Sequence, residues 1–161
     1  MRKRESGFTL IELLIVIAII GILAAIAIPN LLNAVQRGKQ KRSMSDMRAL
    51  ATAVEAYAVD NNNYPAAACP TGTFTNGTFN TMTTSSFSNL SPTYIATAIR
   101  KDGWGRFMAY ALSSDSQAYA IRCFGRDGAS TTINCGTTTN FNDDILYSNG
   151  TFLQWPEGAQ N

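Results

Sequence analysis

The chain has 161 residues, which is enough for one compact domain with an extension and too few for two domains of ordinary size. Its 13 basic and 11 acidic residues nearly balance. It has no histidine, and no phosphate-binding glycine motif, metal-ligating cysteine cluster or base for a serine or cysteine nucleophile is evident. The sequence therefore predicts that the protein is not an enzyme.

An apolar run occupies residues 8–28, with Thr9 and Glu12 as its conspicuous polar members. A helix of this length spans roughly 30 Å, the thickness of the hydrocarbon core of a bilayer. Basic residues 2–4 precede it, which indicates a cytoplasmic N-terminus. The run is longer than the apolar part of a signal peptide. We therefore expect a single retained membrane helix over residues 8–29, with the rest of the chain outside the cytoplasm.

Glu12 is the residue that a membrane helix alone does not explain. A carboxylate near the bilayer interior costs about 2.5–3.5 kcal/mol on insertion scales, so an acid in this position indicates a function and needs a partner. No basic residue lies between Phe8 and Asn30, and Arg4 is two helical turns away. We expect the partner of Glu12 to lie on another chain.

A second helical pattern follows the apolar run. Its apolar residues recur at three- and four-residue steps, which predicts an amphipathic helix over residues 30–59 that packs on the core of its own domain. Asn61–Asn63 and Pro65 end the helix near Val59. The apolar positions are Met44, Met47, Ala51, Val54 and Ala58, with Leu50 and Tyr57 beside them.

The remaining residues, 60–161, predict a loop and an antiparallel β head. Residues 71–93 are rich in threonine, serine and asparagine and indicate a loop. Residues 107–112 and 118–124 indicate one hairpin. A second hairpin joins residues 145–148 and 151–155 through Asn149-Gly150, which suits a type I′ turn. The fold class is α+β, with one long helix packed against a small antiparallel sheet.

The three cysteines, Cys69, Cys123 and Cys135, all follow the membrane segment, which places them in an oxidising compartment. We expect one disulfide and one remaining thiol. Cys123 and Cys135 flank a short loop rich in glycine, serine and threonine, so this pair is preferred. Pairing of Cys69 with either of them stays open.

The N-terminal residues GFTLIELLIVIAIIGILAAIAIPN, after a basic leader, resemble the type IV prepilin family. The resemblance implies a pilin fold, removal of leader residues 1–7 by a prepilin peptidase that cuts after Gly7, and N-methylation of Phe8. It also implies that Glu12 meets the Phe8 amine of a neighbouring subunit in a helical filament. The other partners implied are an inner-membrane assembly platform and minor pilins.

The resemblance further implies local unwinding of the helix between Gly21 and Pro29 in the filament. Both are helix-weakening residues. In an isolated subunit we expect this segment to stay helical.

Four stretches of the C-terminal half, DNNNYP, KDGWGRFMAY, CFGRDG and NFNDDI, resemble in order the head of the major pseudopilins of type II secretion. The family usually has Asp-Pro-Trp-Gly where this chain has Gly103 after Asp102. The resemblance implies a calcium site at Asp127, Asp143 and Asp144, because calcium takes oxygen ligands. A Cys123–Cys135 bridge would instead close the loop without metal, and no other cofactor is implied.

The function implied by the resemblance is that of a structural subunit of a pseudopilus that drives protein export. The alternative within the family is a surface pilus for adhesion, twitching motility or DNA uptake. The chain after residue 49 has more acids than bases, so no nucleic-acid partner is expected. An alternative of another class is a periplasmic binding module anchored by an uncut N-terminal helix.

Overall fold

The computed structural model describes residues 7–60, 80–81, 90–97, 99, 101–112 and 118–158. These residues form one long helix, α1 (Leu10–Asp60), and six short strands. The chain divides into two compact units, one up to Val35 and one from Gln36 onward, and each is described by itself.

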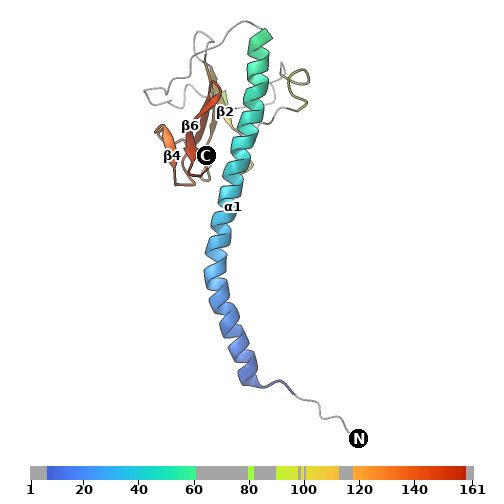
Figure 1. Ribbon diagram of the computed structural model, residues 1–161, viewed down its shortest axis with the longest axis vertical. Helices are drawn as coiled ribbons and strands as arrows, with labels where there is room; N and C mark the ends of the chain where they lie inside the picture. Colours follow the sequence, from blue (N-terminus) through green and yellow to red (C-terminus); the bar gives the residue numbers. More distant parts are fainter. Residues whose placement is uncertain are drawn as a thin grey trace. The chain divides into compact units, whose positions relative to one another are not determined.

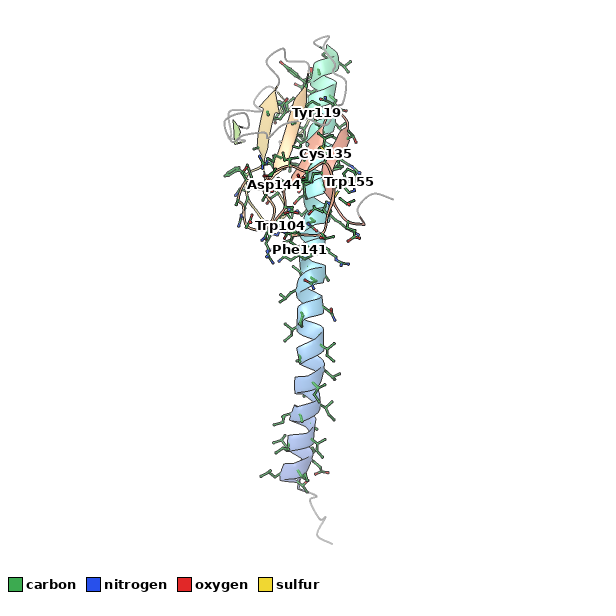
Figure 2. The ribbon with its side chains drawn as sticks, turned by 90° about the vertical axis from the view of Figure 1, so that its left-hand side faces the viewer. Trp104, Tyr119, Cys135, Phe141, Asp144 and Trp155 are labelled. Carbon is green, nitrogen blue, oxygen red and sulfur yellow. The ribbon has the colours of Figure 1, made fainter. Side chains whose placement is uncertain are left out.

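In the first unit, α1 is a regular helix with an exposed apolar surface. Side chains radiate from it on all sides (Figure 2), and Ile11, Leu23 and Leu31 are all more than half exposed. Gly21 and Pro29 lie inside the helix, which confirms that a single chain stays helical there. The Asn30 side-chain amide donates to the Ile26 carbonyl at 3.1 Å, in the turn that Pro29 weakens. Within the described residues, α1 is the one helix long and apolar enough to cross a membrane.

In the second unit, the predicted apolar stripe of α1 is buried. Met47, Leu50 and Ala51 have no exposed surface, and Met44 and Val54 are nearly as deep. Tyr57 and Ala58 remain partly exposed, because the helix ends two to three residues later, at Asp60. The predicted end near Val59 is confirmed to within one residue.

The strands form a single sheet in the order β1-β2-β3-β5-β6-β4. Both predicted hairpins are confirmed, since β2 pairs antiparallel with β3 and β5 pairs antiparallel with β6. Asn149 and Gly150 have φ angles of 48° and 87°, both positive, as a type I′ turn requires. The strands are β1 (Asn80–Thr81), β2 (Ala109–Leu112), β3 (Tyr119–Cys123), β4 (Gly136–Thr138), β5 (Ile145–Ser148) and β6 (Thr151–Pro156).

The expectation of a purely antiparallel sheet is wrong for β4, which pairs in parallel with β6. Its three residues, Gly-Thr-Thr, carry no apolar alternation that marks a strand, so the sequence did not indicate it. Of the expected loop over residues 71–93, residues 80–81 form β1 and pair with β2, and residues 90–93 are a turn. The rest of that loop lies outside the described residues.

The sheet is covered on both faces, as the five buried residues of β3 show. On one face it packs against α1 (Figure 1), where Met47 and Leu50 join Ile121 and other apolar side chains in the main core. The second face carries a smaller cluster against which Ile133 and Phe124 pack. We call residues 129–134, which include Ile133, the covering segment. The cluster consists of Ala109, Ala111, Ala120, Leu146 and Leu153.

Candidate functional site

The first candidate site is the N-terminus of α1. Residues 7–9 are not helical, and α1 begins at Leu10. The Glu12 carboxylate accepts hydrogen bonds at Oε2 from the Thr9 amide, at 2.8 Å, and from the Thr9 hydroxyl, at 2.6 Å. The Glu12 amide donates in return to Thr9 Oγ1 at 3.3 Å. This reciprocal arrangement is a capping box.

The capping box was not predicted, although the sequence Thr-Leu-Ile-Glu before an apolar run indicates one. It gives Glu12 a local structural role beside the one that the resemblance implies. Both hydrogen bonds come from neutral groups of Thr9, so they do not neutralise the charge of Glu12. Gly7 and Phe8 are exposed and lie outside the helix, so the peptide bond between them is accessible.

The second region of interest is the turn at Asp102-Gly103-Trp104-Gly105. The buried Asp102 carboxylate accepts at Oδ1 from the amides of Trp104 and Arg106, both at 2.9 Å. At Oδ2 it accepts from the Cys123 thiol at 3.1 Å. Asp102 therefore organises the turn through the hydrogen bonds that its carboxylate accepts.

This turn packs against α1 through two side-chain contacts. The Gly103 amide donates to Ser43 Oγ at 2.9 Å, and the Trp104 indole donates to Gln36 Oε1, also at 2.9 Å. A Cβ atom at Gly103 would overlap the backbone carbonyl of Lys39. Figure 2 shows Trp104 at one end of the head and Tyr119 toward the other. The departure from the family's proline thus permits a close approach of the turn to α1.

Replacing Gly103 is expected to loosen this contact. Gly103→Ala should lower the free energy of unfolding by about 1–3 kcal/mol, because the added methyl group meets backbone that cannot swing aside. Gly103→Pro should cost more, because it also removes the donor to Ser43. Thermal unfolding of the purified variants measures both effects.

The matched control is Gly38→Ala, on the exposed surface of α1 with open space around it. It should raise stability by up to about 1 kcal/mol, because alanine favours a helix more than glycine does. If Gly103→Pro were as stable as the parent, the close approach at Lys39 would be contradicted.

The preferred disulfide, Cys123–Cys135, is wrong. Cys123 is a free, buried cysteine at the end of β3, and Cys135 is exposed and disulfide-bonded elsewhere. The reason is the alternation of β3, which points Cys123 into the core toward α1. Burial, together with the nearby Asp102, raises the pKa of the Cys123 thiol, so it stays protonated and can donate to Asp102. The partner of Cys135 lies outside the described residues.

The three aspartates proposed for calcium do not converge. Asp127 is exposed, and its Oδ1 accepts from the Ala129 amide at 2.9 Å in a local turn. The two oxygens of Asp143 accept from Thr138 and from Asn140. Asp144 is fully buried. Within the described ranges, which include all three, no three acidic, cysteine or histidine residues are grouped to hold a metal ion.

Asp144 instead pairs with Arg122, and neither side chain has exposed surface. Arg122 Nε donates to Asp144 Oδ2 at 2.5 Å, and Nη2 contacts the same oxygen. Burial raises the pKa of the Asp144 carboxyl, while the guanidinium and the Thr131 amide oppose that rise. Arg122 is not evident from the sequence, because its partner lies 22 residues away.

Comparisons with known proteins match both parts of the chain. Residues 2–28 match the family model of the prokaryotic N-terminal methylation motif. Residues 30–140, more than half of the chain, match the model of type II secretion system (T2SS) protein G. No solved structure matches the chain significantly.

Among curated proteins, the chain is similar to several named type II secretion system core protein G. The one from Aeromonas hydrophila is 45% identical over 64 residues, which are 40% of this chain and 45% of that protein. The one from Pseudomonas aeruginosa is 41% identical, also over 64 residues, 40% of this chain and 45% of that protein. These matches span less than half of each relative. A longer match, to the Vibrio cholerae serotype O1 protein, is 29% identical over 78% of this chain and 84% of that protein. The two family matches are consistent with the fold, which is one long apolar helix with a small sheet. The chain belongs to the type II secretion system protein G family.

Proposed function

We propose that the mature chain is the structural subunit of a type II secretion pseudopilus, a filament that drives export of folded proteins. The observation that carries this proposal is the match to the protein G family over residues 30–140, directly after the methylation motif at residues 2–28. The relatives' shared name, type II secretion system core protein G, supports it.

The exposed apolar surface of α1 supports a role in assembly. In a single chain the side chains from Phe8 to Val35 are almost all exposed, although most of them are apolar. Such a surface suits lipid before assembly and the helices of neighbouring subunits afterwards. With basic residues 2–4 on the cytoplasmic side, the chain would cross the inner membrane once and place its head in the periplasm.

Maturation would remove residues 1–7 by cleavage between Gly7 and Phe8, by a prepilin peptidase, followed by N-methylation of Phe8. The exposed, non-helical backbone at residues 7–9 supports access to this bond. Cleavage creates a positively charged amine four residues before Glu12. In the filament, that amine on a neighbouring subunit would then pair with the Glu12 carboxylate, which lowers the cost of keeping a charge at this depth.

Growth of the filament would use the inner-membrane assembly platform and minor pilins. Local unwinding between Gly21 and Pro29 in the filament is part of the same proposal. It is supported by Pro29, which lies inside α1 and has no amide to donate to the carbonyl four residues earlier, so the helix lacks one hydrogen bond there.

The test compares culture-supernatant proteins of the parent strain with those of a strain lacking this gene, with surface filaments imaged from the same cultures. We expect folded exoproteins to disappear from the medium while surface pili persist. Complementation with the intact gene should restore export. If exoproteins persist while pili vanish, the chain is a surface pilin instead.

A further inference from the structure

We propose that the head of this protein carries its own internal cation, the Arg122 guanidinium, where the resemblance implies calcium, and that its folded state does not need calcium. This inference concerns the head alone and does not depend on the filament function.

The guanidinium joins two parts of the chain that are far apart in sequence. Arg122 lies in β3 on the face opposite α1, because it alternates with Ile121 and Cys123, which belong to the main core. From there it donates to Asp144 Oδ2 and, through Nη2, to the Thr131 carbonyl, both at 2.5 Å. The Arg122 guanidinium therefore connects Asp144, just before β5, to the covering segment.

The covering segment and Asp144 are also bound directly to each other. The Thr131 amide donates to Asp144 Oδ2 at 3.1 Å, and the Asp144 amide donates to Thr131 Oγ1 at 3.2 Å. The Gln154 side chain adds a further link, because it donates to the Asp144 carbonyl at 2.7 Å and accepts from the Asn134 amide at 2.8 Å. Asp144 itself has no exposed surface.

The oxygens in this network are of the kind that calcium selects, namely a carboxylate and a backbone carbonyl. Here both of them point at a guanidinium. A divalent cation bound to the same oxygens would sit against the fixed positive charge of Arg122 in a buried environment, which is strongly unfavourable. The charge of Asp144 is therefore neutralised from within the chain.

Calcium takes six to eight oxygen ligands, and most side-chain oxygens of the three aspartates already accept hydrogen bonds within the described part of the chain. Asp144 Oδ1 is buried. Among the described residues it is the one buried side-chain nitrogen or oxygen atom without a hydrogen-bond partner. The Asp143 oxygens are occupied by Thr138 and Asn140, and Asp127 belongs to a separate exposed turn. The residues that the resemblance assigns to calcium thus do not fit the ion.

The first experiment measures thermal unfolding of the purified full-length protein in detergent, in millimolar calcium and in excess chelator. We expect the same Tm in both to within about a degree, and no stoichiometric calcium binding in equilibrium dialysis with the ion alone. A Tm several degrees higher in calcium, or binding of one ion per chain, would overturn the proposal.

The second experiment tests whether Arg122 and Asp144 act as a pair. Arg122→Met and Asp144→Leu each leave one buried charge without its partner, so each should lower the Tm markedly or prevent folding. The double variant leaves no buried charge and should be more stable than either single variant. A double variant less stable than both would contradict the pairing, and this comparison holds even if one single variant does not fold.

The matched control is Arg126→Met, the same substitution four residues further along the chain. Arg126 is exposed and its Nε donates to Asn142 Oδ1 at 2.9 Å, again across the loop. In the variant, water can hydrogen-bond to Asn142 in place of Arg126. The Tm should therefore shift by no more than about two degrees. A Tm loss equal to that of Arg122→Met would show that the effect is not specific to the buried arginine of β3, and would overturn the special role of Arg122.

Discussion

A Glu12→Gln variant is expected to insert and fold like the parent protein and to lose filament assembly by more than about tenfold. Glutamine keeps the capping box with Thr9, because its side-chain oxygen accepts the same amide hydrogen bond. It removes only the negative charge that the Phe8 amine of the next subunit would meet. A hydrogen bond to a charged group contributes about 1.5–3 kcal/mol, which corresponds to a factor of ten or more for each contact. Sedimentation of sheared filaments measures the yield.

Two further variants separate the cap from the charge. Thr9→Ala keeps the carboxylate and weakens the cap, at a cost of about 1 kcal/mol in helix stability, and should still assemble. Glu12→Ala removes both and should assemble no better than Glu12→Gln. Parental filament yield from Glu12→Gln, together with a defect in Thr9→Ala, would assign Glu12 to helix capping alone.

Leu50→Ala is expected to lower the free energy of unfolding of the head by about 2–5 kcal/mol. Leu50 lies on α1 with no exposed surface, in the core that joins the helix to the sheet. Truncation removes the apolar contacts of the side chain and leaves a cavity that the packed neighbours fill only partly. For a chain of this size the Tm should fall by roughly 2–4 °C for each kcal/mol, as measured by circular dichroism in detergent.

The matched control is Leu32→Ala, the same substitution earlier on the same helix. Leu32 is 58% exposed in the single chain, so its truncation removes few contacts there. The Tm of the monomer should be unchanged within about one degree, while filament yield falls if Leu32 packs against neighbouring subunits. Equal losses of Tm at both positions would contradict the division of α1 into an exposed apolar part and a head-packing part.

The elements that local chemistry specifies were predictable from the sequence. The helix follows from a repeat of apolar residues and from the stop at Asn61–Asn63, and the second hairpin follows from Asn149-Gly150. β4 was not predictable, because its Gly-Thr-Thr sequence becomes a strand only through its partner β6. For such short edge strands, tertiary pairing decides the structure rather than propensity.

The residues of the candidate sites also differ in whether the sequence alone reveals their role. Glu12 is evident because a charge within an apolar run has a known cost, and that cost is local. Arg122 is not evident, because an arginine in a strand normally reaches solvent, whereas this one is buried against Asp144 and the covering segment. Asp143 and Asp144 are adjacent in sequence, yet the first hydrogen-bonds to Thr138 and Asn140 and the second lies in the core. Proximity in sequence was therefore a poor guide to a shared ligand.

The most direct test of the proposed maturation is the intact mass of the protein purified after co-expression with a prepilin peptidase. Cleavage between Gly7 and Phe8 followed by methylation predicts a mass lower by residues 1–7 and higher by one methyl group, with Phe8 as the first residue. A chain that keeps its full mass, with Met1 or Arg2 as the first residue, would contradict maturation as a pseudopilin and would favour a permanently anchored protein.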